Sequence, residues 1–214
     1  MHGTTYLAKF DQEYYMRDQW YGDAHDLVKW GVLLHLAQSY SVKRIVQVAY
    51  FRKSKWGQLK IDGQKHHIPD PVINHFRNMR NIVLLPCEPK IEVLDSLFED
   101  RGQYKQAVTD AVARQHPCIV FLDPDTGLEP DGRPGFEHVL DSELEYIWNK
   151  MSVGDVLVFY QHQTNRNGQP WIEPKRNQFE KALKLPSGSA KVAVGSEIAG
   201  ASDVAIYYCR KGAT

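Results

Sequence analysis

Hydrophobic residues in the second half of the chain form short continuous runs separated by polar segments. Residues 118–122 (C-I-V-F-L) and 156–160 (V-L-V-F-Y) are almost entirely apolar, which is typical of strands buried on both faces of a parallel sheet. Residues 24–39 instead place apolar side chains three and four positions apart, as at Leu27, Trp30 and Leu34. That spacing predicts a helix with a wide, mostly buried apolar face.

Along the whole chain these patterns predict an alternation of strands and helices. The predicted strands are 43–51, 56–61, 81–85, 118–122, 156–160, 190–195 and 204–209. The predicted helices are 24–39, a stretch within 69–80, 91–100, 103–115, 136–151 and 174–185. This order favours an α/β fold whose mostly parallel sheet ends in a C-terminal antiparallel strand pair. We therefore expect a three-layer, Rossmann-like sheet of the methyltransferase type, with residues 1–214 forming a single domain.

Composition and charge limit the function class and the cellular setting. Lys plus Arg and Asp plus Glu both number 26, so the net charge is zero and non-specific polyanion binding over the whole surface is not expected. Basic residues at positions 44, 52, 53 and 55 could form a local nucleic-acid strip, or simply a solvated hairpin. The chain has no apolar stretch near the roughly 20 residues of a membrane span and no N-terminal signal-peptide pattern. With three cysteines that share no metal-like spacing, these features predict a cytoplasmic protein with no membrane partner.

The sharpest candidate site is the segment 121–129, F-L-D-P-D-T-G-L-E. Asp123 and Asp125 follow a predicted buried strand directly, and ligands of doubly wound sheets bind beyond the carboxyl ends of the strands. Pro124 stiffens the turn between them, and Gly127 permits a close approach of the backbone. Such a carboxylate pair could bind a metal, accept hydrogen bonds from an exocyclic amine or act as a general base. The alternative is an Asx-type turn in which Asp123 caps its own backbone.

A second candidate follows the next apolar strand, at Tyr160-Gln161-His162. If the two strands are neighbours, His162 and Asp123 open into one crevice, where the histidine could be an acid, a base or a ligand. The polar segment after it carries Arg166 and leads to Trp171. The alternative is a solvated loop histidine beside a core tyrosine.

A third candidate is the segment that leads into the first predicted helix, Y-G-D-A-H-D-L-V-K at 21–29. Asp23 is an expected helix N-cap, and Asp26 lies near the positive end of the helix. Asp26 and Lys29 are three residues apart and could form a simple surface ion pair. Alternatively, Lys29 could reach across to a phosphate or a carboxylate.

These motifs resemble those of a known family. W-Y-G-D-A-H-D-L-V-K at 20–29 is similar to the A-G-N-x-x-D-x-x-K signature of bacterial 23S ribosomal RNA adenine-N6 methyltransferases, and Asp123-Pro124 stands where that family has D-P-P-Y. The chain also resembles an uncharacterised bacterial family with Y-G-D-x-x-D-x-x-K and D-P-D-x-G motifs. The first resemblance implies S-adenosylmethionine as cofactor and a nucleic-acid adenine as acceptor. It implies that Asp123 accepts a hydrogen bond from the adenine amine and that Pro124 offers its carbonyl.

From the resemblance and the local patterns we predict three groups of site residues. The catalytic group is Asp123, Pro124, Asp125 and His162. The cofactor-binding group is Tyr21, Asp23, Asp26 and Lys29. The substrate-binding group is Thr126, Gly127, Glu129, Tyr160, Arg166 and Trp171.

The sequence departs from the family pattern at two places. Thr126 stands where an aromatic ring would stack on a flipped base, and the first glycine after the first strand is Gly57 rather than part of a glycine-rich turn. These departures keep two other functions open. Asp123, Asp125, Glu129 and His162 would suit Mg²⁺ or Mn²⁺ in a metal-dependent phosphoesterase or nuclease. The third option is a non-catalytic methyltransferase fold that binds a partner or a nucleic acid.

Overall fold

A computed structural model describes residues 23–52, 58–72, 78–163, 165, 168–195 and 200–212. Two of the predicted site residues, Tyr21 and Arg166, lie outside these ranges. Within them, no helix is long and apolar enough to cross a membrane.

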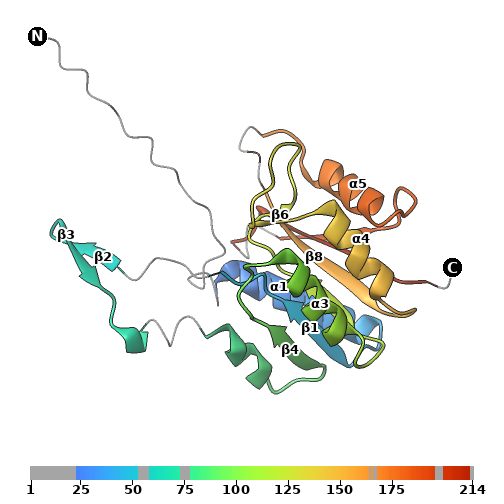
Figure 1. Cartoon of the computed structure of the whole chain (residues 1–214), viewed down its shortest axis with the longest axis horizontal. Helices are drawn as coiled ribbons and strands as arrows, with labels where there is room; N and C mark the ends of the chain where they lie inside the picture. The colour runs from blue at the N-terminus through green and yellow to red at the C-terminus, as the bar shows by residue number, and fades with distance from the viewer. Residues whose placement is uncertain are drawn as a thin grey trace, which may run out of the picture.

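A six-stranded sheet forms the centre of the molecule (Figure 1). Its strands, in spatial order, are β4 (Lys90–Leu94), β1 (Arg44–Val48), β5 (Ile119–Leu122), β8 (Val156–His162), β10 (Val204–Arg210) and β9 (Lys191–Val194). The first four strands run parallel, whereas β10 is antiparallel to both of its neighbours. The predicted α/β fold is therefore confirmed: the sheet is mostly parallel and Rossmann-like, and it ends in an antiparallel pair.

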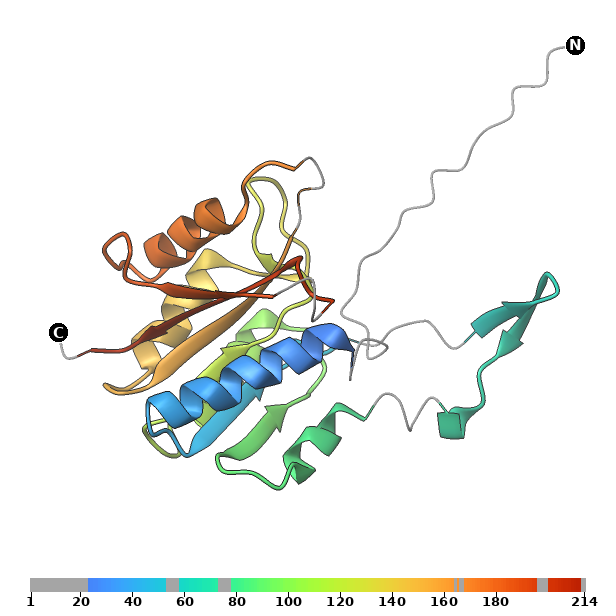
Figure 2. The same cartoon turned by 180° about the vertical axis from the view of Figure 1, so that it is seen from behind.

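Helices cover both faces of the sheet and give it three layers. Helix α1 (Ala24–Ser39) packs on one face, and α3 (Arg101–Val112), α4 (Asp141–Lys150) and α5 (Ile172–Ala182) pack on the other (Figures 1 and 2). Successive residues of β5 alternate between the two cores, since Phe121 packs with the α1 side and Leu122 with the other. Burial on both faces explains why these strands are continuously apolar in the sequence.

Local capping sets the start of α1 at the predicted residue. The Asp23 side chain accepts a hydrogen bond from the backbone N–H of Asp26 at 3.0 Å, which satisfies one of the donors left free at a helix start. The predicted Asp62-Gly63 turn also forms, because both residues take a positive φ (48° and 83°) between β2 (Gln58–Ile61) and β3 (Gln64–His67).

Two predicted elements in the middle of the chain are wrong. Residues 81–85 do not form a strand, because they fall largely within a 3-10 helix, η2 (Met79–Leu84). Residues 91–100 do not form a helix, because the apolar positions at Ile91 and Val93 belong to β4, which pairs in parallel with β1. Pairing with a strand more than 40 residues earlier outweighs the local helical spacing of this segment. Two short strands, β6 (Gly127–Leu128) and β7 (His138–Val139), form a separate parallel pair.

Candidate functional site

Asp123 lies directly after β5 and is almost completely buried, at 1% relative exposure. Its backbone N–H donates to the carbonyl of Val48 at 3.0 Å, which extends the sheet pairing by one residue. Its Oδ1 lies 2.9 Å from Nζ of Lys29, and its Oδ2 accepts a hydrogen bond from Nε2 of Gln47 at 2.9 Å. Each carboxylate oxygen thus contacts one side chain of the protein.

Lys29 links the first helix to the end of the sheet. Its Nζ lies 3.2 Å from Oδ1 of Asp26 and 4.3 Å from the centre of the Tyr160 ring, in addition to its contact with Asp123. Burial alone would lower the pKa of Lys29, but the carboxylates of Asp123 and Asp26 outweigh it and raise the pKa. Lys29 therefore stays charged inside a buried ion pair that joins two sequence motifs 94 positions apart.

Asp125 connects the turn after β5 with the turn after β1. Its Oδ2 lies 2.7 Å from a terminal nitrogen of Arg52, and both side chains are nearly buried. Burial raises the pKa of Asp125 to about 7, although Arg52 pulls it down. A carboxyl with a pKa near neutrality can exchange a proton at physiological pH, as a general base must.

The turn that follows is held by hydrogen bonds to β8. Gly127 has φ +129°, and a Cβ on it would lie 2.2 Å from Oε1 of the buried Gln161. Gln161 in turn accepts from the backbone N–H of Leu128 at 2.9 Å and donates to the carbonyl of Thr126 at 3.0 Å. The Thr126 hydroxyl donates to the carbonyl of Glu137 at 2.8 Å. These contacts fix the path of the backbone around the aspartates.

The four residues predicted as Mg²⁺ or Mn²⁺ ligands belong to separate contacts. Asp123 pairs with Lys29, Asp125 pairs with Arg52, and Glu129 accepts from the backbone N–H of Asp141 at 2.7 Å. Glu129 thereby stabilises the start of α4.

His162 ends β8 and belongs to a second cluster at the same edge of the sheet. Its Nδ1 lies 3.7 Å from Oδ2 of Asp203, and its ring meets the ring of His25 edge-on at 5.9 Å between centroids. His25 also contacts Asp203, through Nε2 at 3.0 Å, and Asp23, through Nδ1 at 3.1 Å. Burial alone would lower the pKa of His25, but hydrogen bonds with Asp23 and Asp203 raise it.

Sequence reasoning missed several members of this edge, among them Asp203, His25 and Asp95. Asp203 lies beside His162 because the next residue, Val204, pairs with His162 across antiparallel strands. No local sequence motif indicates this pairing. His25 lies within the motif at 21–29, between Asp23 and Asp26, and this position next to two carboxylates could have marked it as a candidate site residue. Asp95 follows β4 and pairs with Arg80, but β4 was predicted as a helix, so its carboxyl end was not considered.

The remaining predicted residues occupy supporting positions. Pro124 is buried between the two aspartates, and Tyr160 is buried beneath Lys29. Trp171 directly precedes α5 and packs against the core on the side of α3, α4 and α5.

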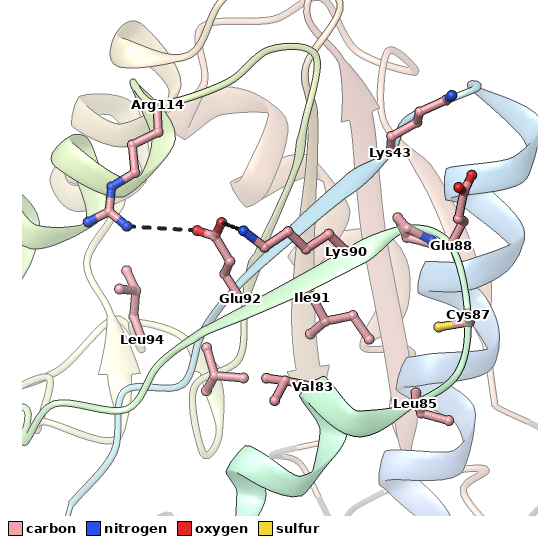
Figure 3. Close-up of a pocket in the computed structure, with 12 residues that line it drawn as sticks. Lys43, Val83, Leu85, Cys87, Glu88, Lys90, Ile91, Glu92, Leu94 and Arg114 are labelled. Atoms are coloured by element: carbon pink, nitrogen blue, oxygen red, sulfur yellow. Dashed lines mark ion pairs between the residues drawn. The ribbon is translucent and has the colours of Figure 1, made fainter.

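A pocket of about 860 Å³ lies on the outer side of the sheet, along β4 (Figure 3). Its wall carries Glu92, which is paired with Lys90 and Arg114, together with apolar side chains such as Val83 and Leu85. A large pocket is the usual first candidate for an active site. This one, however, contains none of the residues that gather at the carboxyl ends of β5 and β8, so we place the candidate site at those strand ends.

Comparison with known proteins gives fold-level likenesses only. No family model matches the chain, and no curated protein matches it. Among solved structures, a candidate methyltransferase from Thermobifida fusca YX is 11% identical, with 89% of this chain and 80% of that chain covered and a TM-score of 0.41. A DUF574 family protein from Streptomyces avermitilis MA-4680 is 9% identical, with 88% and 82% covered and a TM-score of 0.43. Human N-acetylserotonin methyltransferase, solved with S-adenosylmethionine, is 12% identical, with 90% and 46% covered and a TM-score of 0.34.

Proposed function

We propose that the protein is an S-adenosylmethionine-dependent methyltransferase that acts on the exocyclic amine of an adenine in a nucleic acid. The observation that carries the proposal is the 2.9 Å contact between Lys29 and Asp123. These two residues belong to the two motifs that resemble the adenine-N6 methyltransferases, and they meet at the carboxyl edge of the sheet, where ligands of such folds bind.

The donors and acceptors at this edge suit the cofactor. Asp95 follows β4, next to β1, the position at which an acidic residue accepts hydrogen bonds from ribose hydroxyls in Rossmann-type folds. Arg52 follows β1 and would bind the carboxylate of the amino-acid tail, because a guanidinium matches a carboxylate in shape and charge. When bound there, S-adenosylmethionine supplies an electrophilic methyl group.

The protein's own residues then have separate tasks. Asp125, with its pKa raised to about 7, would accept the proton that the acceptor nitrogen loses on methylation. Asp123 acts as a positioning residue, because its oxygens hold Lys29 and Gln47 while its backbone N–H anchors the turn to β1. In this proposal Asp125, rather than Asp123, faces the acceptor.

Transfer of a radiolabelled methyl group to RNA and DNA tests the proposal. We expect incorporation into an adenine-containing polymer, with a rate that rises with pH and has its midpoint near pH 7. Asp125→Asn should lower the rate about 100-fold, the range typical of losing a general base. Asp110→Asn, an exposed carboxylate on α3 that bonds only to Gln106 among the contacts described, should leave the rate unchanged.

Two results would contradict the proposal. One is the absence of transfer to any adenine-containing RNA or DNA by a protein that binds the cofactor. The other is an Asp125→Asn variant that is as active as the Asp110→Asn control.

A further inference from the structure

We propose that His25, His162 and Asp203 form a binding site for a divalent transition metal of the zinc class, with an open coordination position that water fills. The three side chains come from different elements: the first turn of α1, the end of β8 and the residue before β10. One ligand atom from each can be chosen so that all lie within 4.8 Å of one another. The site uses none of Arg52, Asp95 and Asp125, to which the proposed function assigns cofactor binding and proton transfer, so zinc binding can be tested apart from methyl transfer.

The spacing of the donor atoms fits a tetrahedral ion. Zinc bonds to nitrogen and oxygen at about 2.0–2.1 Å, so tetrahedral ligands are about 3.3–3.4 Å apart. Here Nε2 of His25 lies 3.0 Å from Oδ1 of Asp203, and Nδ1 of His162 lies 3.7 Å from Oδ2 of the same carboxylate. The two contacts use different oxygens of Asp203, so a single-oxygen ligand requires the carboxylate or the His162 ring to turn. One donor atom from each residue already lies within 4.8 Å of the other two.

Proton accounting at His25 supports a cation at this position. A neutral imidazole carries one N–H, but both ring nitrogens of His25 face carboxylate oxygens, those of Asp23 and Asp203. A second proton or a metal on the ring would satisfy both contacts. With a metal on Nε2, Nδ1–H donates to Asp23, which is the carboxylate–histidine–metal arrangement that orients many metal-bound histidines.

The ligand types and their exposure narrow the class of metal. Two imidazoles and one carboxylate suit Zn²⁺ or a neighbouring first-row metal, whereas Mg²⁺ prefers oxygen ligands alone. Asp203 and His162 remain 41% and 34% exposed at their side chains. Solvent can therefore reach a bound ion, and three protein ligands plus water is the pattern of an exchangeable or catalytic site rather than a closed structural one.

A second group of potential ligands, His116, Cys118 and Asp155, does not offer a comparable site. The Asp155 carboxylate is fully buried and already accepts from the backbone N–H groups of Cys118 and Ser152 as well as from His116. A metal there would leave buried backbone donors without partners. This comparison favours the cluster at His25.

Calorimetry with Zn²⁺ on the untagged full chain, after removal of metals with a chelator, tests the site. We expect one Zn²⁺ per chain, and at least tenfold weaker binding in both His162→Ala and Asp203→Ala. Asp23→Asn should weaken binding by about tenfold or more, because it removes the carboxylate that orients His25. His35→Ala is the matched control, an exposed histidine on the same helix, and should bind as the wild type does.

The zinc-binding experiment can be interpreted whether or not the protein transfers methyl groups. Circular dichroism of each metal-free variant establishes that it is folded, and cobalt substitution reports on coordination geometry through its visible spectrum. Zinc binding that is absent, or unchanged in folded His162→Ala and Asp203→Ala, would overturn the proposal. Binding that is lost instead on replacing the exposed pair His66 and His67 would overturn it as well.

Discussion

Breaking the buried ion pair of Lys29 and Asp123 should destabilise the fold, and replacing Lys29 should cost more stability than replacing Asp123. At 2.9 Å, two unit charges attract by about 6 kcal/mol at an effective dielectric constant near 20, before desolvation is subtracted. Lys29→Met leaves the Asp123 carboxylate with Gln47 as its remaining side-chain partner, and losing one member of a buried pair costs about 3–5 kcal/mol. Asp123→Asn should cost less, about 2–3 kcal/mol, because Lys29 keeps its contact with Asp26.

The double variant Lys29→Met, Asp123→Asn separates the energy of the ion pair from the cost of burying an unpaired charge. Once Lys29→Met has removed the cation, neutralising Asp123 relieves an uncompensated buried charge, so the two losses should fall short of additivity by about 2 kcal/mol. Urea unfolding followed by circular dichroism measures the free energies of unfolding. Lys43→Met, at an exposed lysine just before β1, should change stability by less than about 0.5 kcal/mol. Additive losses, or a Lys29→Met variant no less stable than this control, would refute the reasoning.

Three further predictions concern the same edge and the start of β5. The pKa of Asp125 is about 7 in the folded protein against about 3.9 in an unfolded chain. Between these two pH values the folded state therefore binds a proton that the unfolded chain has lost, and this contribution to stability disappears as pH rises from about 4 to about 7. Asp125→Asn does not titrate, so its free energy of unfolding, measured with urea, should rise by up to about 4 kcal/mol relative to that of the wild type over this range. Gly127→Ala should cost about 2–4 kcal/mol through its positive φ and its clash with Gln161, whereas Gly132→Ala, which meets nothing within 4 Å, should be near neutral in the same assay. Asp155→Ala should lower the thermal midpoint by several degrees, since it leaves buried backbone donors unpaired; a midpoint equal to that of the wild type would exclude this role.

The parts of the fold that the sequence predicts well are those whose signals are local. Asp23 marks the start of α1 by its own hydrogen bond, and the apolar runs of β5 and β8 indicate burial on both faces of the sheet. β4 escaped prediction because Ile91 and Leu94 are spaced as in a helix, while the interaction that decides the outcome is pairing with β1. Tertiary pairing outweighs local propensity in such short segments.

In the candidate site, too, the local features were predicted and the contacts between distant segments were not. The carboxyl-end rule placed Asp123 and His162 in one crevice on the condition that their strands are neighbours, and β5 does pair with β8. It could not indicate that Lys29 engages one of these residues and Asp203 the other, because those contacts join segments distant in sequence. Arg52 was expected in a nucleic-acid strip or a solvated hairpin, yet it is a nearly buried partner of Asp125. The pattern of charged residues in a sequence does not indicate which charged side chains form buried ion pairs.

Binding of S-adenosylmethionine, measured by calorimetry, tests the central claim most directly. We expect the folded full chain to bind S-adenosylmethionine and S-adenosylhomocysteine in the micromolar range, and Arg52→Ala to bind both at least tenfold more weakly. Arg114→Ala removes an exposed arginine beside the pocket along β4 and should bind as the wild type does. Absence of binding by the folded wild type, or equal binding by the two arginine variants, would contradict the assignment of this edge as a methyltransferase cofactor site.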